Sequence, residues 1–161
     1  AVDWALDKAV TSGTSNTTFS PNAACTRAQA VTFLWRAAGS PEPTATTTAF
    51  TDVKEGSYYY KAVLWAVENS ITSGATETTF APDATCTRSQ IVTFLYRMEK
   101  SPEATAENPF TDVKAGAFYE NAVLWAVKEN ITTGATATTF DPAGDCTRGQ
   151  IVTFLYRCLN K

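Results

Sequence analysis

The sequence predicts an all-α protein made of three tandem helix–loop–helix repeats. The first observation is a period of about 60 residues, marked in each copy by one tryptophan, glycine, phenylalanine, proline and cysteine. The second is an apolar pattern with helical spacing at two places in each copy. The third is a capping signal at the start of the second helix, where a threonine is followed three residues later by a glutamine.

The second and third copies define the repeat most clearly. Residues 50–97 and 110–157 align without a gap and share 33 of 48 residues. Both copies open with Phe-Thr-Asp-Val, and the counterpart in the first copy would precede Ala1, so we expect the chain to begin inside a repeat. The predicted division is repeat 1 (1–39), repeat 2 (50–100) and repeat 3 (110–161), joined by linkers 40–49 and 101–109.

The first helix of each copy is identified by its apolar run. It is expected over residues 2–10, 60–69 and 121–130. The run includes a tryptophan in each copy, namely Trp4, Trp65 and Trp125. We expect these large side chains to pack in the core, and the alternative is that they line grooves between repeats.

The second helix of each copy begins with a capping box followed by an arginine. The caps are Thr26, Thr87 and Thr147, their partners are Gln29, Gln90 and Gln150, and the arginines are Arg27, Arg88 and Arg148. Free N–H groups at a helix start favour anions, and a guanidinium suits a carboxylate. We therefore predict an anion-binding site at each helix start. The alternative is that these arginines donate to carbonyl groups of neighbouring loops.

The other three arginines fall at the end of the second helix. They are Arg36, Arg97 and Arg157, so the six arginines occupy only two repeat positions. A cation near a helix C-terminus complements the helix dipole, and this is the role that we expect for them.

Composition excludes several classes of function. The net charge of −3 and a pI near 4.9 argue against a nucleic-acid partner. The chain has no histidine, which removes the usual catalytic triads and proton shuttles, so we predict no enzyme and no cofactor. No apolar stretch is long enough for membrane insertion.

These motifs together resemble those of S-layer homology domains. That family's repeat has Phe-x-Asp-Val, a helix with Trp-Ala, a loop ending in Phe-x-Pro, and Ile-Thr-Arg-Ala-Glu at the second helix. Here Phe-Thr-Asp-Val, Leu-Trp-Ala-Val, Thr-Thr-Phe-x-Pro and Cys-Thr-Arg-x-Gln follow in that order over nearly the whole chain. Glutamine replaces the glutamate, which keeps the cap but loses a charge, and cysteine replaces the aliphatic residue.

The resemblance implies a compact pseudo-threefold arrangement of the repeats, with grooves between them. It implies non-covalent binding of secondary cell-wall polysaccharide through an acidic sugar, for example a pyruvylated one, in these grooves. An exported protein would thereby be anchored at the bacterial cell wall or S-layer. By motif, anion recognition corresponds to Arg27, Arg88 and Arg148. If each groove draws on two neighbouring repeats, at most two grooves are expected to be complete.

Further candidate ligand-binding residues surround these arginines. They are Gln29, Gln90, Gln150, Asp52, Asp112, Tyr59 and Tyr119. The two aspartates are expected to cap a short turn or, alternatively, to support a groove from behind. The tyrosines, like the neighbouring Tyr58, Tyr60 and Phe118, would offer an apolar wall to a sugar ring, and the alternative is partly buried packing.

The four cysteines are expected to be free thiols. Cys146 and Cys158 are 12 residues apart near one helix, or ~18 Å by helical rise, which is too far for a disulfide. The alternative is a bond from Cys158 to Cys25 or Cys86. No Cys-x-x-C motif is present, so we expect no zinc site.

The predicted partner is thus a cell-wall polysaccharide, with no nucleic acid and no membrane insertion. We expect a monomer or a part of a larger cell-surface polypeptide. The alternative function is an extracellular protein–protein interaction or structural repeat module without glycan binding, because repeat units keep their fold while binding other ligands.

Overall fold

The computed structural model describes all residues from Ala1 to Lys161 and contains six helices and no strands. The helices are α1 (Val2–Asp7), α2 (Arg27–Ala37), α3 (Tyr60–Glu68), α4 (Arg88–Met98), α5 (Glu120–Lys128) and α6 (Arg148–Leu159). The predicted all-α class and the two helices in each repeat are confirmed. The first helices end one to three residues earlier than predicted, because Ala9, Ser70 and Asn130 turn the backbone with φ of 54°, 58° and 57°.

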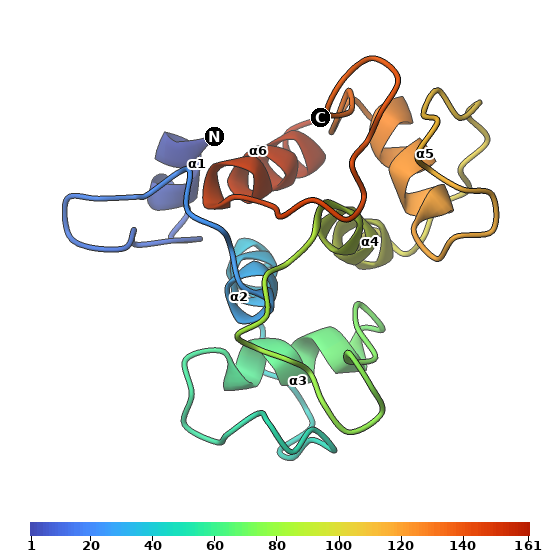
Figure 1. Cartoon of the computed structure of the whole chain (residues 1–161). Coiled ribbons are helices and arrows are strands. Elements are labelled where there is room, and N and C mark those ends of the chain that lie inside the picture. The colour runs from blue at the N-terminus through green and yellow to red at the C-terminus, as the bar shows by residue number, and fades with distance from the viewer.

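Packed helix pairs come from different repeats. The second helix of repeat 1, α2, packs against α3 of repeat 2, and α4 packs in the same way against α5 of repeat 3. The cycle closes when α6 packs against α1, which brings segments from both ends of the chain together. Figure 1 shows the resulting three lobes around the centre. The structural unit is therefore shifted by half a repeat relative to the sequence unit.

The centre of the molecule has pseudo-threefold symmetry. Helices α2, α4 and α6 contact one another there. Two residues before the start of each of these helices, three backbone hydrogen bonds form a closed ring, in which the N–H of Cys25 donates to the carbonyl of Cys146 (3.0 Å), Cys86 to Cys25 (2.8 Å) and Cys146 to Cys86 (2.9 Å). This ring ties every repeat to both of the others through residues distant in the sequence.

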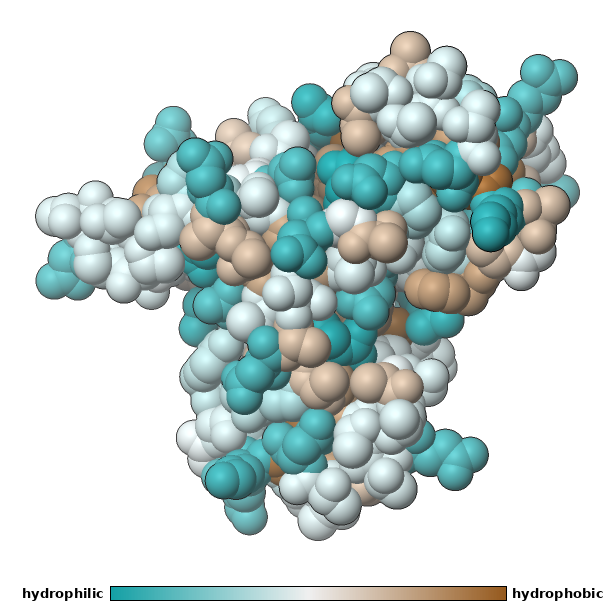
Figure 2. Space-filling view, viewed as in Figure 1, coloured by the Kyte–Doolittle hydropathy of each residue, from teal (hydrophilic) through white to brown (hydrophobic).

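The core is continuous through the three lobes. Trp65 and Trp125 are buried, as predicted, whereas Trp4 is half-buried and packs edge-to-face on Tyr156 with ring centroids 5.6 Å apart. Phe80 and Phe140 are fully buried. Hydrophobic residues are scattered among polar ones on the face shown in Figure 2.

All four cysteines are free and buried. Burial raises the pKa of Cys25 to about 12 although Arg148 opposes the shift, and burial also raises the pKa of Cys146 and Cys158 to about 12. No group of three or more Cys, Asp or Glu side chains is placed to hold a metal ion. The longest helix has 12 residues, and none has the length and hydropathy that a bilayer crossing requires.

Candidate functional site

The capping boxes are present at the start of α2, α4 and α6. In α2 the N–H of Gln29 donates to Thr26 Oγ1 (3.2 Å), and the N–H of Thr26 donates to Gln29 Oε1 (3.2 Å). The same reciprocal bonds occur in the other two helices. Each box satisfies two donors that would otherwise lack a partner.

The remaining donors of the first helical turn are also satisfied inside the protein. In α2 the N–H of Arg27 donates to the carbonyl of Ala84 (2.9 Å) and the N–H of Ala28 to that of Pro82 (3.0 Å). The corresponding bonds in α4 and α6 also go to a loop of another repeat. The expectation of free helix-start amides for an anion is therefore wrong, because the neighbouring loop supplies carbonyl groups in their place.

The arginines that follow the caps are buried against phenylalanine rings. Arg27 Nε donates to the carbonyl of Phe80 (2.9 Å), and the guanidinium carbon lies 4.9 Å from the centroid of the same ring. Arg88 makes the same pair of contacts with Phe140 at 2.8 and 4.9 Å, and Arg148 makes them with Phe19 at 3.0 and 4.9 Å. The alternative interpretation, in which these arginines donate to carbonyl groups of neighbouring loops, is therefore correct for the Nε atom of each guanidinium.

Another nitrogen of two of these arginines has no partner. The Nη2 atoms of Arg27 and Arg88 are buried and make no hydrogen bond within the protein. Burial lowers the pKa of Arg27, although Cys86 and Asp52 oppose the shift, and a guanidinium stays charged under such conditions. Burying a cationic donor without a partner costs free energy. A ligand acceptor that reached these nitrogen atoms would therefore stabilise the protein.

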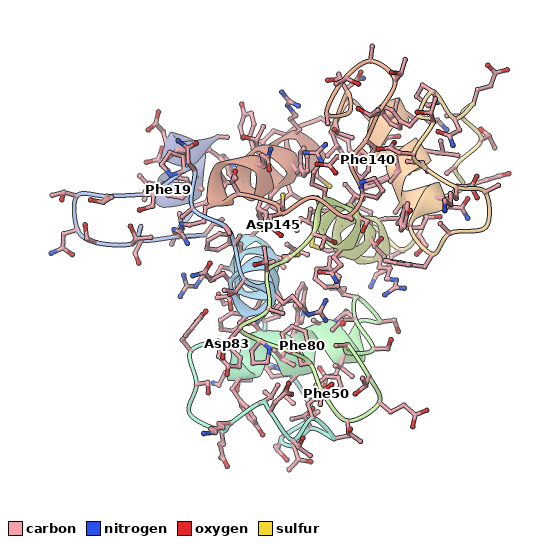
Figure 3. All side chains as sticks on the ribbon, in the orientation of Figure 1. Phe19, Phe50, Phe80, Asp83, Phe140 and Asp145 are labelled. Carbon is pink, nitrogen blue, oxygen red and sulfur yellow. The ribbon has the colours of Figure 1, made fainter.

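Asp52 and Asp112 hold the phenylalanine loops from behind. The N–H groups of Phe80 and Ala81 donate to the two oxygens of Asp52, both at 2.8 Å, and Asp112 accepts in the same way from Phe140 and Asp141. The aspartates therefore clamp a loop 28 residues away and do not cap a local turn as first expected. Figure 3 shows Phe19, Phe80 and Phe140 in three different lobes.

Two equivalent grooves open beside these stacks, between neighbouring lobes. The Arg27 groove has a volume of about 430 Å³, and the Arg88 groove has one of about 520 Å³. The residues that define the Arg27 groove are Arg27, Thr72, Gly74, Gln90, Thr93 and Arg97. Their counterparts in the Arg88 groove are Arg88, Thr132, Gly134, Gln150, Thr153 and Arg157. Each groove therefore combines an arginine of one repeat with a helix face of the next.

The grooves are cationic. Each is lined by two arginines and by no aspartate or glutamate. Arg97 and Arg157 also donate from Nη1 to the carbonyls of Ile71 and Ile131, both at 3.2 Å. Their contacts are therefore not limited to the C-terminus of their own helix. Their place in a groove was not predicted, although the spacing of Gln90, Thr93 and Arg97 by three and four residues puts them on one helical face.

Gly74 and Gly134 lie in the groove walls at positions where only glycine fits. Their φ angles are 97° and 98°, a region that favours glycine. A Cβ atom at Gly74 would lie 2.5 Å from both Phe50 Cε1 and the carbonyl oxygen of Thr76. Any side chain here would therefore displace both the loop and the aromatic ring behind it.

Only some of the predicted residues meet in a groove. Arg27 lies with Gln90, and Arg88 lies with Gln150, whereas Arg148 and Gln29 line neither groove. Arg148 Nη2 makes a long contact of 3.5 Å with Thr11 Oγ1.

The predicted tyrosines lie outside the two grooves. Tyr59 and Tyr119 sit at the starts of α3 and α5 and pack against the core. They stack edge-to-face on Tyr58 and Phe118, with centroids 5.1 and 5.0 Å apart. Phe118, which is 65% exposed, does line the Arg27 groove, so the outer aromatic of this pair is the one available to a ligand there.

The sequence model of the S-layer homology domain matches residues 1–31, 49–92 and 109–152. The chain belongs to the S-layer homology domain family. The three matches coincide with the repeats seen in the sequence, each ending in the first half of the second helix.

The relatives that the chain matches are much longer proteins. A cell surface protein of Thermoanaerobacter kivui is 32% identical over 71% of this chain and 16% of its own length. A surface-layer 125 kDa protein of Lysinibacillus sphaericus is 35% identical over 59% of the chain and 8% of its length, and an endoglucanase of Bacillus sp. (strain KSM-635) is 32% identical over 67% and 11%. The chain thus spans less than a fifth of each of these relatives.

The S-layer homology domain is a non-catalytic anchoring module that binds cell-wall polymers. Family membership and the surface-protein relatives therefore indicate a location at the cell wall or cell surface and a general role in cell-wall anchoring.

Proposed function

We propose that the chain anchors an exported protein by binding secondary cell-wall polysaccharide non-covalently in the Arg27 and Arg88 grooves. The recognised group is an acidic sugar, such as one that carries a pyruvate ketal. This proposal assigns ligand contacts to Arg27, Arg88, Gln90 and Gln150.

The charge of the grooves carries the proposal. The whole chain has a net charge of −3, yet each groove has two arginines and no acidic residue. A neutral glycan would gain little from two guanidinium groups, whereas a carboxylate on a sugar ring is matched by their paired donors. Asp52 and Asp112 support this arrangement indirectly, because they hold the loops on which Arg27 and Arg88 stack.

The other groove residues suit sugar hydroxyl groups. The hydroxyls of Thr93 and Thr153 donate to the carbonyls of Ser89 and Gly149, both at 2.7 Å, so that their free lone pairs are available as acceptors. Phe118 offers an apolar surface beside the Arg27 groove. Acceptors, donors and an aromatic face within a site of several hundred Å³ are typical of a small-ligand site.

The experiment compares binding of purified cell-wall polysaccharide by three variants. Arg97→Gln and Arg157→Gln each remove a groove cation that is accessible to a ligand, while Arg36→Gln removes the repeat-equivalent arginine that lines neither groove. A lost hydrogen bond to a charged group predicts about tenfold weaker binding for each groove variant and little change for Arg36→Gln. Titration calorimetry measures the affinity.

The same titration with polysaccharide from which ketals have been removed by mild acid tests the ligand. Affinity should fall at least as far as it does in the Arg97→Gln and Arg157→Gln variants, because the carboxylate that the arginines bind is removed. Undiminished binding of the ketal-free polysaccharide would exclude the pyruvate ketal as the recognised group, and equal losses in all three variants would exclude the two grooves. A chain that binds only a protein partner would favour the interaction module.

A further inference from the structure

A third cavity lies away from the arginine grooves, between the end of α2, the start of α3 and the first linker. Its volume is about 470 Å³, within the ~300–1,000 Å³ of common small-ligand sites. We call it the linker pocket, and its defining residues are Trp35, Glu42, Glu55, Tyr58, Tyr60 and Lys61. Three of the residues that line it are aromatic, whereas the Arg27 groove has two phenylalanines and the Arg88 groove has one.

Two of its aromatic walls are held in position by the linker. Trp35 Nε1 donates to the carbonyl of Pro41 (2.9 Å), and the hydroxyl of Tyr60 donates to the carbonyl of Thr46 (2.9 Å). The third ring, Tyr58, is 58% exposed and packs edge-to-face on Tyr59. Rings fixed before binding lose little conformational freedom when a ligand stacks on them.

The linker itself is fastened to α3 on both sides of the pocket. Lys61 forms an ion pair with Glu42 at 2.8 Å. Glu68 accepts hydrogen bonds from the backbone N–H of Thr44 (3.1 Å), from the Thr44 hydroxyl and from the N–H of Ala45. Together with the bonds to Pro41 and Thr46, these contacts hold the linker at five residues and make it part of the pocket wall.

The charge of the linker pocket differs from that of the grooves. Two carboxylates, Glu42 and Glu55, and one ammonium, Lys61, give a net charge of −1, against two uncompensated arginines in each groove. A carboxylate-bearing sugar is therefore disfavoured in the linker pocket. A neutral sugar ring fits, because its C–H face covers the aromatic rings while its hydroxyls reach Glu55 and the backbone.

The pocket is not copied in the next repeat. Tyr96 keeps the tie to its own linker by donating to the carbonyl of Pro102 (2.9 Å). However, Glu120 and Asn121 stand in place of Tyr60 and Lys61, so one aromatic wall and the ion pair are missing there. The aromatic set is thus a feature of this one junction and not a requirement of the repeat fold.

We propose that the linker pocket binds a neutral sugar ring on the faces of Trp35, Tyr58 and Tyr60. It would be a saccharide site separate from the arginine grooves, and it does not depend on the proposed acidic ligand. A chain with both kinds of site would contact two chemically different sugars at once.

The test is a nuclear magnetic resonance titration of the ¹⁵N-labelled full chain with two neutral trisaccharides, cellotriose and tri-N-acetylchitotriose. The expected result is a saturable shift of the Trp35 indole N–H and the amides of residues 56–61, with a Kd of about 1 mM for at least one sugar. Tyr58→Ala should weaken this binding about tenfold, because an exposed stacking face is lost. The control Tyr156→Ala removes an exposed aromatic side chain that lines neither groove nor the linker pocket, and it should leave this binding unchanged.

Several results would overturn this proposal. One is the absence of a saturable shift with both sugars while the amide spectrum shows a folded chain. Another is a sugar-induced shift at residues 72–75 or 132–134 instead of the pocket. Another is preferential binding of Nα-acetyl-lysine amide, which has a free side-chain ammonium group, in the same titration. That result would mean that the carboxylates of the pocket select a cation. None of these outcomes depends on the arginine variants used for the grooves.

Discussion

Three equivalent arginine–phenylalanine stacks lie in the molecule, and only two of them are backed by a carboxylate. Phe80 and Phe140 are held by Asp52 and Asp112, whereas no aspartate holds the loop of Phe19. There the hydroxyls of Thr14 and Ser20 share a hydrogen bond of 2.8 Å. The guanidinium nonetheless lies 4.9 Å from the ring centroid in all three stacks.

This comparison separates two contributions to the same geometry. The helix start and the neighbouring loop carbonyl position the arginine in every copy, since those contacts are common to all three. The carboxylates of Asp52 and Asp112 additionally hold the loops of Phe80 and Phe140 in place. Phe80 and Phe140 are fully buried, while Phe19 is only half-buried, so the clamped loops also pack more closely.

The largest difference between the stacks is expected from removal of the rings. Phe140→Ala deletes a fully buried ring and should lower the free energy of unfolding by about 3–5 kcal/mol. Phe19→Ala deletes a half-buried ring and should cost about 1–2 kcal/mol. Urea denaturation followed by circular dichroism measures both values. Equal losses would mean that the clamped loop does not pack more closely than the loop of Phe19.

A smaller difference is expected from the clamps themselves. Asp112→Ala leaves the N–H groups of Phe140 and Asp141 without their acceptor and should cost about 2 kcal/mol. Ser20→Ala removes a hydroxyl pair near the surface and should cost no more than about 0.5 kcal/mol. If the serine variant loses as much stability as the aspartate variant, the two loops are held equally well.

The smallest effect is expected from acidification. Burial raises the pKa of Asp112, but hydrogen bonds from Phe140 and Asp141 and the attraction of Arg88 outweigh it, so the pKa lies below the ordinary 3.8. A lowered carboxylate pKa adds stability above that ordinary value, and this stability is lost as the pH falls through the folded-state pKa. The Asp112→Ala variant should therefore lose less stability than the parent chain between about pH 5 and pH 3. Urea denaturation at several pH values measures the free energy of unfolding of both chains. If that free energy falls equally in the two chains across this range, the clamp is contradicted.

The candidate site was only partly predictable from the sequence. The capping boxes follow from a local rule, because both partners lie within one helical turn. The grooves do not, because Arg27 meets Gln90 and Arg97 only after the lobes pack. The assumption that a helix start has free amides failed because the carbonyls of Pro82 and Ala84 arrive from another repeat.

The sequence by itself determined the three repeats, the helix starts and the family, since period, apolar spacing and caps are properties of neighbouring residues. Tertiary structure alone decided which helices share a lobe, which arginine nitrogens remain unpaired and where the cationic grooves open. The physical reason is that each helix buries its apolar face against a helix of another repeat. The closing ring of Cys25, Cys86 and Cys146 joins positions 60, 61 and 121 residues apart, and no local pattern specifies that ring.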